Sequence, residues 1–98
     1  MSDNKYQGFT NYATWNVCLW ADNEYSIYQA KCAWLERKSK PVRAWQAKRF
    51  YLDYITSYQT DLRGNKEPGT RIRDIDWKDV AETWETDRLE MLNCQNRA

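Results

Sequence analysis

The sequence predicts an all-α fold, a small single-domain bundle of about four helices. Apolar residues recur three and four positions apart along four segments, and no segment shows the alternation of a β-strand. Capping residues, a proline and a Pro-Gly pair separate these segments, as in helices joined by short connections. A chain of 98 residues supplies one hydrophobic core. We therefore expect one domain over residues 1–98, frayed at 1–8 and 93–98, with a loop at 64–74.

The first helix is expected over residues 12–22, with Asn11 as its N-cap and Thr10 as the alternative cap. Its apolar side chains fall on two faces, so we expect it to be buried from both sides, with Trp15 in the core. Asn16 is interpreted as a structural polar group that hydrogen-bonds a neighbour, because an unpaired buried amide costs about 1–3 kcal/mol. The faces consist of Tyr12, Trp15, Cys18 and Leu19, and of Ala13, Val17 and Trp20.

Two start signals predict the second and third helices. Asn23 followed by an acidic residue indicates a break near Asp22, so a second helix is expected over 24–38, with a kink as the alternative to the break. Pro41 is expected at the first position of a third helix over 41–62, because proline lacks the amide hydrogen that would be unsatisfied there.

The third helix is expected to end at Gly64, since glycine suits a left-handed cap. A loop over 64–74 follows, with 70–73 as a candidate extended stretch. Asp76 is the predicted N-cap of the fourth helix. The inward stripe of that helix is expected to be Trp77, Val80, Ala81, Trp84 and Met91.

The composition predicts a folded domain with aromatic groups to spare. Charged residues make up 30% of the chain and the mean hydropathy is −0.99, yet six tryptophans and seven tyrosines are present. Each such ring can bury about 150–250 Å² and still present one polar atom. The aromatic residues therefore suit both a small core and a binding face, and composition alone does not divide them.

The charges are balanced in total but unevenly distributed. The formal net charge is +1, which provides no general attraction to nucleic acid or to an anionic membrane. Residues 31–50 carry seven cationic side chains against one acidic, whereas residues 74–90 carry seven acidic against two cationic. This pattern predicts either a bipolar molecule or two helices that pair with each other.

No pattern typical of an enzyme, a metal site or a cofactor site is found, so we expect a non-enzymatic protein without a cofactor. The chain has no histidine, and its three cysteines form no Cys-x-x-Cys pair. Asp74, Asp76 and Asp79 span a helix start, where capping explains them better than a cation loop does. Reduced thiols and the lack of a signal or membrane-spanning pattern predict a cytoplasmic protein. We expect Cys18 and Cys32 to lie on apolar helix faces and Cys94 to be exposed at the surface.

The candidate binding site lies in the basic segment 34–49, where cationic and aromatic side chains alternate. Such a mixture can follow phosphates and stack bases, can bind another protein, or can be an ordinary solvated helix face. The candidate partner-binding residues are Trp34, Arg43, Trp45, Lys48 and Arg49.

The run Asn-Tyr-Ala-Thr-Trp-Asn-Val-Cys-Leu-Trp over residues 11–20 resembles the Asn-Tyr-x-Thr-Trp-Asn-Val-x-Leu-Trp motif of small proteins of unknown function, encoded mainly by phages and plasmids. The resemblance covers residues 8–23 and, faintly, 74–84. It departs at Ala13, where those proteins usually have an acidic residue, and at Ala21, where they have a larger aliphatic one. It implies a phage or mobile-element source, and it does not indicate any biochemical activity. The motif residues interpreted as structural are Asn11, Trp15, Asn16, Trp20 and Asn23.

The function expected from these observations is a small protein-binding module that acts on a host protein, as an inhibitor or anti-defence protein. The surplus of aromatic residues and the charged patches support binding, and the resemblance supplies the setting. The alternatives are a nucleic-acid-binding protein that uses segment 34–49 and a homo-oligomeric structural protein.

Overall fold

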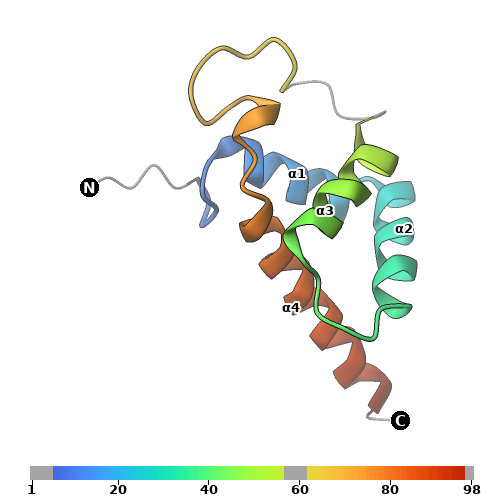
Figure 1. Cartoon of the computed structure of the whole chain (residues 1–98). Coiled ribbons are helices and arrows are strands. Elements are labelled where there is room, and N and C mark those ends of the chain that lie inside the picture. Colours follow the sequence, from blue (N-terminus) through green and yellow to red (C-terminus); the bar gives the residue numbers. More distant parts are fainter. Residues whose placement is uncertain (1–5, 57–61, 97–98) are drawn as a thin grey trace.

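The computed structural model describes residues 6–56 and 62–96, which contain four α-helices and no β-strand (Figure 1). The predicted all-α bundle of four helices is therefore confirmed. A short π-helix, η1, continues α3, and a 3-10 turn, η2, precedes α4. The elements are α1 (Tyr12–Asn23), α2 (Tyr25–Glu36), α3 (Ala44–Phe50), η1 (Tyr51–Ile55), η2 (Ile72–Asp74) and α4 (Trp77–Asn96).

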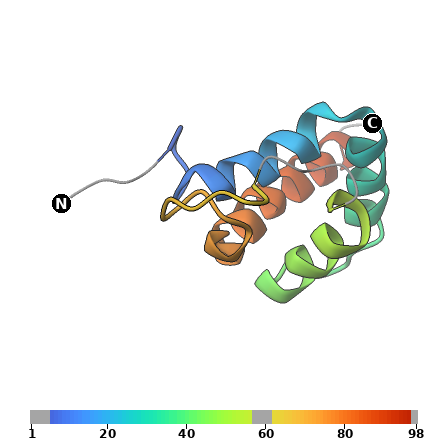
Figure 2. The ribbon, with the colours of Figure 1, turned by 90° about the horizontal axis from the view of Figure 1, so that it is seen from above.

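The longest helix, α4, contacts the other three. α1 and α4 begin side by side and run in the same direction, and α2 turns away from the end of α1 (Figure 2). All four helices contribute to the core around Trp84, whose ring centroid lies 5.4 Å from that of Phe50 and 6.1 Å from that of Trp34. The buried apolar residues are Ala13, Val17, Cys18, Ala21, Ile27, Leu35, Val42, Ala47, Phe50, Tyr51, Ile55, Leu62, Ile75, Val80, Ala81 and Trp84.

The predicted break between the first two helices is confirmed, and it lies at Glu24. This residue has an extended backbone (φ −87°, ψ 114°), and its amide donates to the carbonyl of Trp20. Asn23 was predicted to mark the start of the second helix. In the structure it is the last residue of α1, and its side-chain amide donates to the carbonyl of Leu19 at 3.0 Å. A single extended residue thus separates two helices that a kink would have kept continuous.

The prediction that α1 is buried from both sides is wrong, because its small residues form the buried face. Trp15 and Trp20 are half-buried, and Leu19 is 37% exposed. The ring of Trp15 lies outside the core, in a cluster with Tyr6 and Tyr12 at centroid distances of 4.9 and 5.6 Å. Asn16 is buried as predicted, and its amide nitrogen lies 3.4 Å from the Tyr12 hydroxyl. The buried residues of α1 are Ala13, Thr14, Asn16, Val17, Cys18 and Ala21.

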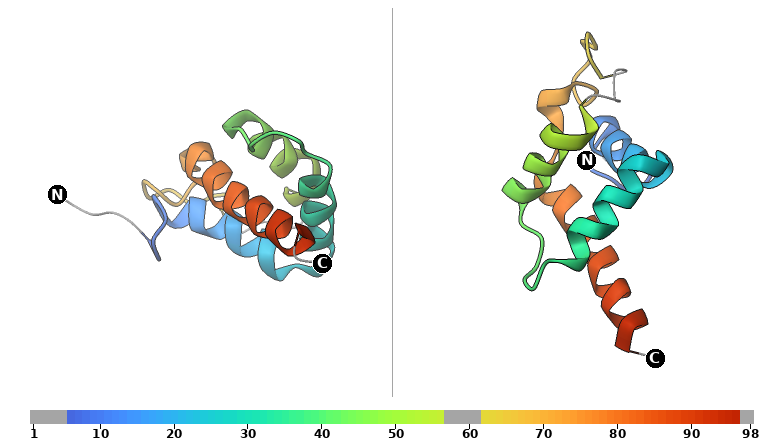
Figure 3. Two further views of the ribbon diagram at one scale, coloured as in Figure 1. Left: turned by 90° about the horizontal axis from the view of Figure 1, so that it is seen from below. Right: turned by 90° about the vertical axis from the view of Figure 1, so that its right-hand side faces the viewer.

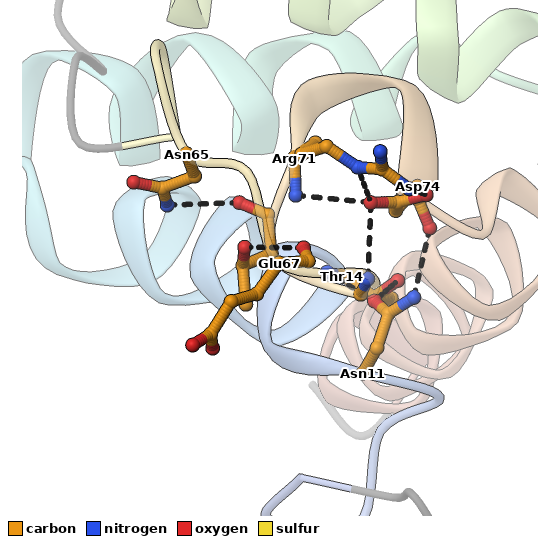
Figure 4. A network of polar contacts seen from close by, with 8 residues as sticks. Asn11, Thr14, Asn65, Glu67, Arg71 and Asp74 are labelled. Atoms are coloured by element: carbon orange, nitrogen blue, oxygen red, sulfur yellow. Dashed lines mark hydrogen bonds and ion pairs between the residues drawn. The ribbon is translucent and has the colours of Figure 1, made fainter.

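Hydrogen bonds of Asn11 and Thr14 join the start of α1 to the segment before α4 (Figure 4). Asn11 is the N-cap, as predicted: its Oδ1 accepts from the amide of Thr14 at 2.9 Å and from the Thr14 hydroxyl at 2.7 Å. Asn11 Nδ2 donates to the carbonyl of Asp74 at 2.9 Å. Thr14 Oγ1 accepts from the amide of Asp76 at 2.9 Å. The carbonyl of Gly69 accepts from the amide of Ala13, so two loop segments meet this helix end.

Thr10, the alternative cap, instead connects α1 to α4. Its amide donates to Asp79 Oδ2 at 2.8 Å, and its hydroxyl lies 2.8 Å from Asp76 Oδ2 and 2.9 Å from Asp79 Oδ2. Asp76 Oδ1 accepts from the amides of Lys78 and Asp79 at 3.1 and 3.3 Å, which confirms Asp76 as the N-cap of α4.

Both ends of the described part of the chain have a defined backbone conformation. Tyr6 and Phe9 exchange two backbone hydrogen bonds of 2.8 Å around Gln7 and Gly8, whose φ angles are 52° and 87°. Two consecutive positive φ angles are typical of the tight type I′ turn, so this polar segment is ordered by turn chemistry. At the other end, α4 continues to Asn96. Residues 1–5 and 97–98 lie outside the described part of the chain.

The third helix begins at Ala44, not at Pro41 as predicted. Arg43 is extended (φ −104°, ψ 156°), and its amide donates to Gln46 Oε1 at 3.1 Å, so Gln46 closes the helix start. The amide of Val42 donates to Glu85 Oε1 of α4 at 2.9 Å. Side chains thus satisfy both amides ahead of the helix, and Val42 is buried in the core.

After α3, the structure differs from the prediction for the rest of the third helix and for part of the loop that follows it. Residues 51–55 form the wider η1, and 57–61 lie outside the described residues. Gly64 has the predicted left-handed conformation, with φ +81°. Within the candidate extended stretch 70–73, Arg71 is extended (φ −104°, ψ 159°), whereas Ile72 and Arg73 lie in η2. The Asp74 carboxylate closes this turn by accepting from the Arg71 side chain at 2.7 Å and from two loop amides. The hydrogen bond from Arg71 lowers the pKa of Asp74 to about 2.

Replacing Thr14 with valine should lower the free energy of unfolding by about 2 kcal/mol, because the backbone amide of Asp76 and the side-chain oxygen Oδ1 of Asn11 both lose their bond to the Thr14 hydroxyl. Thr14→Ser retains the hydroxyl and should cost under about 1 kcal/mol for the lost methyl. Urea unfolding of both variants measures the difference. Equal stability of the two variants would show that the hydroxyl does not hold the junction.

Gly69→Ala should destabilise the protein more than Gly64→Ala. Both glycines have positive φ angles, +85° and +81°, which cost an alanine about 1–2 kcal/mol. A Cβ on Gly69 would also lie 3.3 Å from the Cβ of Asn11, whereas one on Gly64 meets nothing within 4 Å. The extra crowding should add about 1 kcal/mol, measurable by thermal unfolding. A larger loss for Gly64→Ala would contradict the close approach of this loop to α1.

Candidate functional site

The five predicted partner-binding residues lie where α3 meets the end of α2. α3 packs against α4 (Figure 3), and the opposite face of α3 is directed away from the core. Trp45 is 65% exposed. The other residues on α3 and at its N-cap, Arg43, Lys48 and Arg49, are also exposed, whereas Trp34 on α2 is half-buried. The structure therefore keeps four of the five on the surface and places Trp34 at the edge of the core.

A shallow hollow of about 270 Å³ brings Trp34, Trp45 and Arg49 together. Its apolar lining is a row of rings: the Phe50 centroid lies 5.0 Å from that of Trp34 and 4.7 Å from that of Tyr54. Arg43 and Lys48 do not line it. Lys38 and Gln46 also line it and belong to the predicted segment 34–49, although they were not among the predicted partner-binding residues. Phe50, Asp53 and Tyr54 lie outside that segment and were not predicted, although the four-residue spacing of Trp45, Arg49 and Asp53 indicates a shared helix face.

Hydrogen bonds hold the polar side chains around this hollow. Lys38 Nζ donates to Gln46 Oε1 at 2.7 Å and lies 5.5 Å from the centroid of the Trp34 ring. Burial lowers the pKa of Lys38, and the positive charges of Arg88 and Arg43 lower it further. Arg49 Nε lies 3.3 Å from Asp53 Oδ2, an exposed pair that contributes little stability. The hollow thus combines an aromatic floor with cations that are only lightly neutralised.

Lys31, by contrast, does not belong to the basic surface. It is 1% exposed, and its Nζ lies 2.6 Å from Asp22 Oδ1 and 2.9 Å from Asp87 Oδ2. Burial alone would lower its pKa, but the hydrogen bonds to the two carboxylates raise it overall. Lys31 therefore shows that the basic and acidic segments pair in part, while most cations of segment 31–50 remain at the surface.

A larger hollow of about 620 Å³ lies between the Tyr6–Phe9 turn and the loop at Pro68 and Gly69. Its polar groups from Asn11 and Gly69 are already used in the junction with α1. We therefore regard the α3 hollow, where charged side chains and an exposed indole adjoin an apolar floor, as the candidate site.

The carboxylates and thiols have structural surroundings. Among the described side chains, no three of His, Cys, Asp or Glu lie together as metal ligands would. Cys18 is buried, Cys32 half-buried and Cys94 exposed, as predicted, and none forms a disulfide. Within residues 6–56 and 62–96, no helix has both the length and the apolar character needed to cross a membrane.

Comparison of the chain with family models, with curated proteins and with solved structures gives no match. The fold and the site therefore define a class only, a small all-α protein with an aromatic and cationic surface hollow.

Cys18 should make the protein less stable at alkaline pH. Burial, followed by the nearby Asp22 carboxylate, raises the pKa of this thiol from 9.0 to about 12. The unfolded thiol ionises first as pH rises, so the stability present below pH 9.0 is lost progressively up to about pH 12. Between about pH 8 and about pH 10.5 the unfolding free energy should therefore fall less in Cys18→Ala than in the parent. The exposed-site control Cys94→Ala should behave like the parent, and an equal fall in both variants would contradict this role of Cys18.

Proposed function

We propose that this chain is a small non-enzymatic protein-binding module, and that the face of α3 around Trp45 docks against another protein. The observation that carries the proposal is the exposure of Trp45. The other five tryptophans are buried or half-buried, whereas Trp45 leaves 65% of its surface in water. Tryptophan and arginine are the residues most enriched at the energetic centres of protein interfaces, and Arg49 lies beside Trp45 in the hollow.

The surface around Trp45 favours a protein partner over a nucleic acid. Leu52, about two helical turns further along the α3–η1 face, is 52% exposed and offers apolar contact. Asp53 lines the hollow and forms an exposed ion pair with Arg49, and a carboxylate at this position is unfavourable for a phosphate backbone. Exposed aliphatic and acidic groups among the cations suit a protein surface with mixed chemistry.

The setting of this function follows from the resemblance to phage and plasmid proteins. Asn11, Thr14 and Asn16 of that motif are buried or form the α1 junction, so the motif supports the fold and leaves α3 available for binding. In our proposal the protein acts in the cytoplasm of a bacterial host, where it binds and inhibits a host protein.

Photo-crosslinking should test the docking face directly. A photoreactive phenylalanine derivative at position 45 should give a discrete crosslink to another polypeptide when the protein is made in bacterial cells. The same group at Tyr25, a 71% exposed position of α2, is the matched control and should give none. Unlabelled parent protein should compete for the crosslink, and Trp45→Ala should compete at least about 30-fold less well, a loss of about 2 kcal/mol.

The outcomes separate the alternatives. Trp45→Ala should melt within about a degree or two of the parent, because the removed ring is largely exposed. Identical crosslinks from positions 45 and 25 would refute docking at α3. Nuclease-sensitive crosslinks would favour nucleic-acid binding, and a product at twice the monomer mass would favour a homo-oligomer.

A further inference from the structure

The surface that surrounds the α3 hollow carries an excess of positive charge. Between residues 36 and 53, five cationic side chains are exposed against two acidic ones. Lys38 adds a sixth, half-buried cation at the wall of the hollow. The exposed cations are Arg37, Lys40, Arg43, Lys48 and Arg49, and the exposed acids are Glu36 and Asp53.

The apolar and cationic groups of this surface alternate along one helical face. Trp45 and Leu52 are seven residues apart, close to two helical turns, and Lys48 and Arg49 lie between them. A partner that contacts Trp45 and Leu52 therefore also meets cationic side chains at each step. Such a face is complementary to a segment in which apolar and acidic residues alternate.

The hollow has room for one apolar side chain of the partner. An enclosed apolar cavity of roughly 150 Å³ accommodates a benzene ring. The α3 hollow has a volume of about 270 Å³, and its lining includes the rings of Trp34, Phe50 and Tyr54. A leucine or phenylalanine side chain in this space would exclude water from the exposed edge of Trp45.

The neutralisation pattern shows where partner carboxylates would be favourable. Among the described side chains, no acidic group lies within ion-pair distance of Arg43 or Lys48, and Arg49 has one exposed pair with Asp53. Burial is the main cause that lowers the pKa of Lys38, and repulsion by Arg88 and Arg43 adds to it while Glu85 opposes it. A carboxylate beside the hollow would offset that repulsion.

We propose that the partner of this site is an acidic protein segment, which inserts one leucine or phenylalanine side chain beside Trp45 and pairs flanking carboxylates with Arg43, Lys48 and Arg49. This inference rests on the proposed function and adds the chemistry of the partner. It excludes a phosphate backbone as the intended ligand, because a nucleic acid cannot supply the aliphatic group for Leu52 and the hollow together.

Selection from a displayed library of random nonapeptides on the immobilised full chain tests this chemistry without knowledge of the partner. Enriched peptides should carry two or more acidic residues around one leucine or phenylalanine. The strongest enriched peptide should bind the charge-reversed variant R43E/K48E/R49E at least tenfold more weakly, and its affinity should fall with salt. The control variant K66E/R73E reverses two exposed cations outside the hollow and should bind normally.

Several results would overturn the inference. Neutral or basic enriched peptides, no enriched peptide, or equal binding to R43E/K48E/R49E would each reject an acidic partner. Tighter binding of a thymidine 15-mer than of any peptide would replace it with a nucleic acid. A concentration-dependent dimer that the charge reversal abolishes would replace it with a second copy of the chain. A specific crosslink at position 45 together with non-acidic peptides would reject the inference and leave the proposed function standing, whereas absence of the crosslink would reject the function itself.

Discussion

The rest of the structure depends on the hydrogen-bonded junction between Asn11, Thr14 and the segment from Asp74 to Asp76. Thr14 is fully buried, so its hydroxyl must find partners within the protein, and it finds them in the Asn11 side chain and the Asp76 amide. The bond between Thr14 and Asp76 and that between Asn11 and Asp74 each join residues more than 60 positions apart in sequence. They place the first turns of α1 and α4 side by side, and this start sets how α4 runs along the bundle.

The position of α4 in turn determines which side of α3 is exposed. Glu85 accepts from the amide of Val42, and Arg88 donates to the carbonyl of Lys38, so α4 holds the connection that leads into α3. The ring of Trp84 fills the space beneath Phe50. With that space occupied, Trp45 lies at the outer edge of the hollow beside Phe50 and stays largely in water. The candidate site is therefore a consequence of how the core is filled.

The aromatic residues divide between packing and surface roles in a way that composition could not show. Trp84 and Tyr51 are fully buried, and Phe50 connects the core to the hollow. Trp15 forms a separate ring cluster with Tyr6 at the N-terminal turn. The cationic side chains also divide between the interior and the surface. Lys31 is buried between two carboxylates, whereas the other cations of the basic surface remain available to a partner.

The sequence alone determined the features that depend on near neighbours in the chain. The number of helices, the caps at Asn11 and Asp76, the break before α2 and the left-handed Gly64 follow from local spacing, local hydrogen bonds and backbone sterics. The aromatic and cationic character of segment 34–49 is likewise a property of neighbouring residues and can be read from the sequence directly.

Only the tertiary structure decided features that depend on distant partners. The helix α3 begins at Ala44 and not at Pro41, and the segment before it is held against α4 by the bond from the Val42 amide to Glu85. Lys31 became a core residue because Asp22 and Asp87 come together around it. Trp15 lies outside the core and Thr14 is buried in it because the small residues of α1 form its buried face. Trp45 stays exposed because Trp84 already fills the space beneath Phe50. Burial depends on which helix faces meet, and helical periodicity identifies a face without naming its neighbour.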